Sequence, residues 1–251
     1  MTTTKTKTET VREALERLGA CPAIFRLLGS VADHQPREVE AGWWVEQALD
    51  LARRDGDGPC VGALGWLESH GLVPHVLAGA RLDHARLAGA YLDGASLDGA
   101  RLDHARLDSA SLVDASLDGA RLDHARLDGA SLARASLDGA SLAGASLAGA
   151  YLDHAYLARA SLDGAYLDGA SLDGASLDGA YLAGASLAGA SLAGASLAGA
   201  YLARAYLARA RLDGASLAGA YLAGASLDGA YRPEGGIAGW TPDTEGRLRR
   251  G

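Results

Sequence analysis

Three histidines recur at intervals of twenty residues, and each follows an aspartate: Asp83 and His84, Asp103 and His104, Asp123 and His124. Zinc accepts both imidazole and carboxylate ligands, so the pattern raises the question of a metal site. Arginines at the same spacing offer a simpler interpretation, in which Arg81, Arg101 and Arg121 pair with these aspartates. We favour this solvated salt-bridge ladder and expect no metal, because a structural zinc site closes with four ligands and no closed set is specified here.

Serine, histidine and aspartate also suggest a hydrolase, but in this chain each of them recurs many times at regularly repeated positions. Catalysis requires one singular, preorganised constellation. The chain contains no GxxxxGK[ST], HExxH or GxGxxG motif, so phosphate-binding, metalloprotease and dinucleotide signatures are missing. We therefore expect a protein that is not an enzyme, with no catalytic residues and no cofactor.

A strict period of five residues dominates the chain. Leucine occupies every fifth position from Leu82 to Leu227, and alanine every fifth position from Ala80 to Ala230, which makes thirty consecutive units. Five residues of α-helix advance about 500°, so the leucines would cover every side of the helix. In a flat strand, an odd spacing would send successive leucines to opposite faces. Only a chain that turns a corner once per unit buries all of them, so the period predicts a solenoid.

Glycine supplies the corners of this solenoid. It follows the leucine by two residues in most units, as at Gly89 and Gly94, and it takes positive φ at little steric cost. The motif RLDHARL begins at Arg81 and returns at Arg101 and Arg121. This recurrence every twenty residues predicts that four units make one coil.

The tandem pattern A(S/Y/R)L(D/A)G resembles the pentapeptide-repeat family, in which a small residue lies two positions before a central leucine or phenylalanine. The resemblance implies a mainly β fold, a right-handed four-sided parallel β-helix with leucine and alanine inside. This chain departs from the family pattern because every centre is leucine and none is phenylalanine.

The residue pattern changes outside the repeats. Residues 1–9 are polar, and we expect a disordered tail there. Apolar residues at helical spacing predict a small α-helical domain over 10–71. The β-helix should extend over 72–231, and residues 232–251 should form a C-terminal cap and tail.

The charge balance excludes several classes of partner. The net charge is −8, and residues 80–230 hold 11 arginines and 17 aspartates, a net −6. The predicted arginine column Arg86, Arg106 and Arg126 therefore does not indicate direct nucleic-acid binding. The uncharged stretch 180–203 never leaves the five-residue register, so we expect no membrane span. Two separated cysteines and no apolar leader point to the cytoplasm.

Aspartates at the outward positions form the first candidate interface. The gyrase-protecting members of the family, of Qnr and MfpA type, are rigid acidic rods that mimic DNA and bind type II topoisomerase. The resemblance transfers this role to a set of outward aspartates: Asp98, Asp118, Asp138, Asp163, Asp168, Asp173 and Asp178. It implies a protein that modulates DNA gyrase or protects it from inhibitors.

Tyrosines form the second candidate interface. Tyr181, Tyr201 and Tyr221 should stack in an exterior column among alanine and serine. An uncharged aromatic strip is typical of a protein interface, although the rings also have each other to pack on. Dimerisation of gyrase-binding relatives through this end implies a homodimer through the C-terminal coils. The alternative function is a structural or adaptor protein, in which the rod is a spacer or self-assembly scaffold and the helical domain recruits a protein partner.

Overall fold

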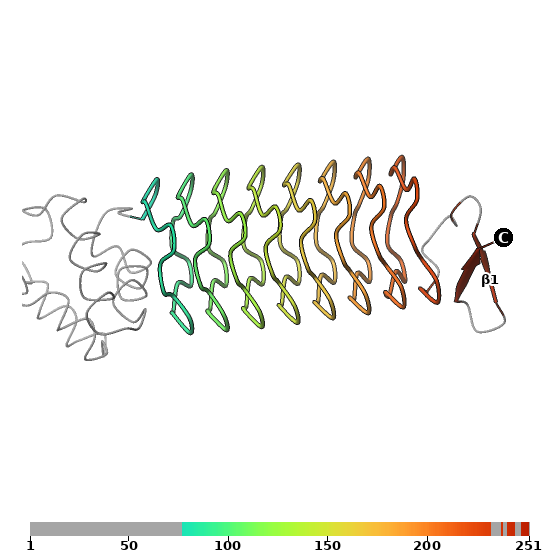
Figure 1. Ribbon diagram of the computed structural model, residues 1–251, viewed down its shortest axis with the longest axis horizontal. Helices are drawn as coiled ribbons and strands as arrows, with labels where there is room; N and C mark the ends of the chain where they lie inside the picture. The colour runs from blue at the N-terminus through green and yellow to red at the C-terminus, as the bar shows by residue number, and fades with distance from the viewer. Residues whose placement is uncertain (1–76, 232–236, 238–239, 244–246, 251) are drawn as a thin grey trace, which may run out of the picture.

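The computed structural model describes residues 77–231, 237, 240–243 and 247–250. Between residues 77 and 231 the chain winds into a regular rod of stacked coils (Figure 1). Parallel β-bridges join residues twenty positions apart, from Arg81 with Arg101 through Tyr206 with Ser226. The predicted coil of four five-residue units is therefore confirmed.

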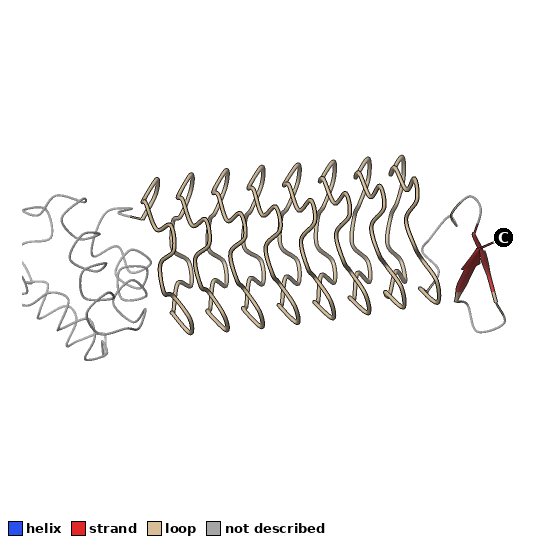
Figure 2. Ribbon diagram, viewed as in Figure 1, coloured by secondary structure: helices blue, strands red, loops and turns tan. Residues whose placement is uncertain are grey.

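Each side of the coil contributes a single bridge residue, so the rod is drawn as loop rather than strand (Figure 2). The N–H of Leu82 donates to the carbonyl of Arg101 at 2.7 Å, and the N–H of His84 donates to that of Asp103 at 2.9 Å. In the other direction, the N–H of Arg101 donates to Ala80 at 2.8 Å. Repeating these three bonds on every side satisfies the backbone between adjacent coils.

Tight turns form the four corners. The N–H of Ala85 donates to the carbonyl of Leu82 at 3.0 Å, and the third residue of that turn, His84, has φ of 60°. Positive φ at the third residue alone is the signature of a type II turn, which favours glycine. Glycines at this position have φ between 63° and 72°, as predicted. Ten other residues are held in the same conformation: His84, His104, Ser109, Asp114, His124, Arg134, His154, Arg159, Arg204 and Arg209.

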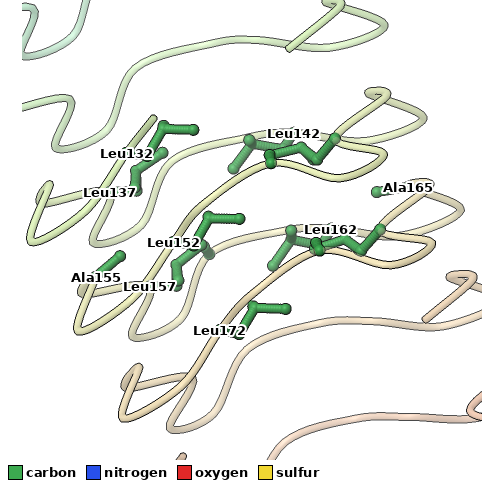
Figure 3. Packing of buried hydrophobic residues seen from close by; sticks show 14 of the residues in the cluster. Leu132, Leu137, Leu142, Leu152, Ala155, Leu157, Leu162, Ala165 and Leu172 are labelled. Carbon is green, nitrogen blue, oxygen red and sulfur yellow. The ribbon is translucent and has the colours of Figure 1, made fainter. Parts of the chain in front are cut away.

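The core is a column of leucines flanked by alanines along the axis of the rod (Figure 3). The leucines from Leu77 to Leu212 are at most 1% exposed. Leu217 and Leu222, in the last coil, are only partly buried. Burial of a leucine side chain contributes about 2 kcal/mol, so this column is the main source of stability of the rod.

The two strands of the described chain lie beyond the rod. Strand β1 (Trp240–Pro242) pairs antiparallel with β2 (Leu248–Arg250). Strand β2 docks on the last coil, because Leu248 accepts from the N–H of Gly229 at 3.0 Å and donates to Ala230 at 2.6 Å. The Leu248 side chain is 1% exposed and joins the core.

The predicted disordered tail and helical domain, residues 1–9 and 10–71, lie outside the described residues. Most of the segment 232–239 does too. Residues 180–203 form ordinary coils of the rod, and the described part of the chain has no helix long and apolar enough to cross a membrane.

Candidate interaction surfaces

The outer surface of the rod divides into four faces, because residues twenty apart lie above one another. Face 1 begins with residues 80–84, face 2 with 85–89, face 3 with 90–94 and face 4 with 95–99, and each continues at every twentieth residue. In every unit the residue before the leucine and the two after it are available to the surface.

The histidines lie on face 1, as predicted. The rings of His84 and His104 stack with centroids 5.0 Å apart, and those of His104 and His124 are 5.2 Å apart. Two zinc–nitrogen bonds of about 2.1 Å can span at most about 4.2 Å, so equivalent nitrogens of stacked rings cannot share one ion. Among the described residues, no cluster of three or more histidine, cysteine or acidic side chains could hold a metal.

Arginine and aspartate pair between coils on faces 1 and 2. Arg101 lies 3.3 Å from Asp83, and Arg121 lies 2.9 Å from Asp103, both one coil below. On face 2, Arg126 contacts Asp108 at 3.1 Å. The predicted salt-bridge ladder is present, and it neutralises carboxylates of the N-terminal coils.

The seven predicted aspartates do not form one patch. Asp98, Asp118 and Asp138 follow one another in a column on face 4, and Asp178 continues the column after Ala158. The remaining three, Asp163, Asp168 and Asp173, lie on faces 1, 2 and 3 of a single coil. Together with Asp178 they form a band around the rod at residues 160–179, which we call the acidic band.

Each of these aspartates binds the coil above it. The N–H of Asp118 donates to Asp98 Oδ1 at 3.1 Å, and the N–H of Ala193 donates to Asp173 Oδ1 at 2.9 Å. Serine hydroxyls donate to the same oxygen in several units, as Ser191 does to Asp173. One carboxylate oxygen is thus occupied within the rod, and the other is left to the surface. This second role of the aspartates was not predicted, although the recurrence of serine eighteen residues after aspartate is visible in the chain.

The acidic band differs from the N-terminal coils in its charge. No described cation forms an ion pair with Asp163, Asp168, Asp173 or Asp178, whereas aspartates on faces 1 and 2 of the first coils, such as Asp83, Asp103 and Asp108, pair with arginine. Asp163 and Asp178 are exposed, while Asp168 and Asp173 are half-buried. The band is therefore an uncompensated group of four negative charges.

Asp114 and Arg134 form a separate pair on face 3. Arg134 donates to both carboxylate oxygens of Asp114, at 2.7 and 2.6 Å. These hydrogen bonds lower the pKa of Asp114 below its ordinary value, with the charge of Arg134 acting in the same direction.

The tyrosine column lies on face 1, where bridges connect Tyr181 with Tyr201 and Tyr201 with Tyr221. The rings of Tyr181 and Tyr201 stack with centroids 5.2 Å apart, and the three side chains are 46%, 49% and 55% exposed in chain order. The column is thus in place as predicted, next to the C-terminal end of the rod.

The last coil of the rod differs from the earlier coils in its backbone hydrogen bonds. Seven amide N–H groups there have no acceptor among the described residues: Leu212, Gly214, Leu217, Gly219, Leu222, Gly224 and Leu227. Their counterparts in every earlier coil donate to the coil above. Strand β2 docks where face 2 meets face 3, through Gly229 and Ala230, and Ile237 packs against the core.

A cavity of about 480 Å³, which was not predicted from the sequence, lies where face 2 meets β2. Its lining includes Tyr206 and Arg209 from the rod and Arg247 and Arg249 from the C-terminal segment. The sequence feature that could have pointed to this cavity is Arg209, an arginine at a position that glycine occupies in most units.

A family model described as pentapeptide repeats matches the chain in eight copies, over residues 76–112, 110–147, 135–174, 175–212 and 200–231. A comparison with curated proteins finds no match. Among solved structures, similarity extends to HetL, a pentapeptide repeat protein involved in heterocyst differentiation regulation in the cyanobacterium Nostoc sp. strain PCC 7120. The two are 33% identical over 63% of this chain and 87% of HetL, with a TM-score of 0.35.

Rfr23 from the cyanobacterium Cyanothece 51142 is 35% identical over 38% of this chain, which spans 58% of Rfr23, with a TM-score of 0.28. A trypsin-treated variant of QnrB1, a plasmid-mediated fluoroquinolone resistance protein, is 18% identical over 57% of this chain and 76% of QnrB1, with a TM-score of 0.47.

Proposed function

This chain belongs to the pentapeptide-repeat family, and from that membership we propose that it is a non-enzymatic, protein-binding rod. The described residues support a binding role through their rigidity, since each coil is held to the next by repeated backbone hydrogen bonds. A surface that is already ordered loses little conformational entropy on association.

In its finer form, the proposal is that the rod mimics DNA, binds DNA gyrase or a related type II topoisomerase, and protects it from inhibitors. The observation that carries it is the acidic band. Four carboxylates on one coil, with a rise of about 4.8 Å, amount to one charge per about 1.2 Å. Duplex DNA carries one per about 1.7 Å. The coil above, residues 180–199, has no charged residue, so the negative charge of the band ends sharply on its C-terminal side.

The column of Asp98, Asp118 and Asp138 extends the negative surface toward the N-terminal coils on face 4. Hydrogen bonds from the next coil fix the carboxylates in position, as the N–H of Asp138 does for Asp118 at 3.0 Å. The cationic groove of a topoisomerase would then bind carboxylates that the rod already holds in fixed positions. We propose accordingly that the protein acts in the cytoplasm on a protein partner, without direct contact with nucleic acid.

The test is DNA supercoiling by gyrase with rising amounts of the purified protein, with and without a quinolone. The key variant replaces Asp163, Asp168, Asp173 and Asp178 with asparagine, which retains the oxygen that accepts from the coil above. A matched control removes four charges from the N-terminal coils through Asp103→Asn, Asp108→Asn, Asp123→Asn and Asp128→Asn.

Inhibition or protection at low micromolar protein that the band variant loses and the control retains would support DNA mimicry by the band. Equal loss in both variants would attribute the effect to net charge rather than to the band. Absence of any effect at tens of micromolar wild-type protein would overturn the gyrase proposal.

The C-terminal end of the rod favours a second candidate function, a self-assembly scaffold. Leu217 and Leu222 are only partly buried there, and several amide N–H groups have no acceptor among the described residues. Solenoid ends require a cap. A second copy placed against this end would cover these leucines and bring its own tyrosine column nearby. We propose Tyr181, Tyr201 and Tyr221 as part of this homodimer surface.

Sedimentation velocity tests the homodimer. We expect a dimer at tens of micromolar that Tyr201→Ser weakens, since serine is a frequent residue in that slot and should leave the coil folded. Tyr156→Ser, on face 4 two coils away, is the control. A wild-type protein that remains monomeric at this concentration would remove the scaffold proposal.

A further inference from the structure

The cavity of about 480 Å³ at the C-terminal end of face 2 has the size of a small-molecule site. Its lining joins two parts of the chain that are distant in sequence, because β2 folds back onto the last coil through Gly229 and Ala230. It lies outside the acidic band and the tyrosine column, so neither proposed interface uses it.

Three arginines give the cavity a positive character. Arg247 and Arg249 direct their Nε atoms toward Asp243, at 3.4 and 3.3 Å. Arg209 has no ion-pair partner among the described residues, and its side chain passes close to Gly229, which carries no side chain. A guanidinium presents a planar fork of donors that matches phosphate and carboxylate oxygens.

Arg209 occupies a turn position that the coil holds at positive φ. Its φ is 60°, a conformation that costs a side chain other than glycine about 1–2 kcal/mol. Glycine fills the equivalent position directly above it, Gly229. The coil thus accepts glycine at this position, and the arginine found here places a cation at the cavity.

Two aromatic rings and one carboxylate complete the lining. Tyr206 and Tyr231 are 50% and 41% exposed, so both offer ring surface on which a flat group can stack. Asp228 would repel a purely anionic ligand, but it can accept a hydrogen bond from an amino or hydroxyl group. The lining thus combines cations for a phosphate, rings for a base, and an acceptor for its polar edge or sugar.

We propose that this cavity binds a nucleoside monophosphate. The phosphate contacts Arg209 and the arginines of the C-terminal segment, and the base stacks on a tyrosine ring.

Isothermal titration of the full chain at low salt, with adenosine 5′-monophosphate, adenosine and phenyl phosphate as separate probes, tests the proposal. We expect the monophosphate to bind with a Kd below about 1 mM, and each of the other two to bind at least tenfold more weakly. Equal affinity for adenosine would contradict the role of the arginines, and equal affinity for phenyl phosphate would contradict recognition of a nucleoside. No heat with any probe at several millimolar would overturn the site.

Arg209→Gly is the informative variant, because glycine is the usual residue of this slot and relieves the positive φ. Loss of a charge-assisted hydrogen bond should raise the Kd for the monophosphate by at least about tenfold. Arg159→Gly is the matched control, since Arg159 has φ of 58° at the same turn position and lies fifty residues earlier, on face 4. Unchanged binding in Arg209→Gly, or an equal loss in Arg159→Gly, would contradict the assignment.

Discussion

Arg134 lies one coil above Asp114 and donates two hydrogen bonds to its carboxylate, from Nε and Nη2 at 2.7 and 2.6 Å. Both residues occupy the turn position that glycine usually fills, with φ of 58° and 57°. The pair therefore links two adjacent coils through side chains that the lattice does not need. The hydrogen bonds lower the pKa of Asp114 and raise that of Arg134.

Arg134→Gly should raise the pKa of Asp114 toward its ordinary value, since it removes both the hydrogen bonds and the charge. A carboxyl group with a lowered pKa stabilises the folded state above its unfolded pKa, and that contribution disappears as pH falls through the folded value. The contribution of the ion pair should thus be lost from the variant at neutral pH and absent from both proteins in acid, where only the pH-independent gain from relieving the positive φ of Arg134 separates them. Carboxyl-carbon NMR titration measures the shift directly. If Arg159→Gly shifted Asp114 equally, the local pair would not be its cause.

Leu142→Ala should cost about 2–5 kcal/mol of unfolding free energy, because Leu142 is fully buried between complete coils and leaves a cavity. Leu222→Ala should cost less, since Leu222 lies in the last coil and is only partly buried. Urea unfolding followed by circular dichroism compares them. Equal losses would mean that the last coil is covered as well as the middle of the rod.

Gly164→Ala should destabilise the rod by about 1–2 kcal/mol, through backbone strain alone. Gly164 has φ of 65°, and nothing lies within 4 Å of the position that its Cβ would take. His154→Gly should instead raise the free energy of unfolding by about 1 kcal/mol, because His154 is held at φ of 58° and glycine adopts this conformation without strain. Thermal unfolding of both variants tests the pair. A stabilised Gly164→Ala protein would contradict the type II turn.

Asp173→Ala should destabilise the rod by about 1–3 kcal/mol, because Ser191 and the N–H of Ala193 lose their common acceptor. Asp173→Asn retains an acceptor oxygen and should cost less. Chemical denaturation distinguishes the two. A large loss in the asparagine variant would mean that charge, and not hydrogen bonding, matters at this position.

The histidines and aspartates show which contacts the twenty-residue period of the sequence can predict. The twenty-residue echo of RLDHARL predicted that His84, His104 and His124 would stack, and they do. The same periodicity placed Asp98, Asp118 and Asp138 in one column. It also places Ser191 eighteen residues after Asp173, but the hydrogen bond between them depends in addition on the rotamers of two side chains in different coils.

The sequence by itself determined the repeating unit, the buried leucines and alanines, the corners and the number of sides. A five-residue period admits one geometry that buries every leucine, and each coil repeats the environment of the one before. Only the tertiary structure decided how the periodicity ends and which charges remain unpaired. Strand β2 docks on the last coil, and the C-terminal segment forms a cavity there with Arg209. These contacts join non-repeating segments, so no period in the sequence encodes them.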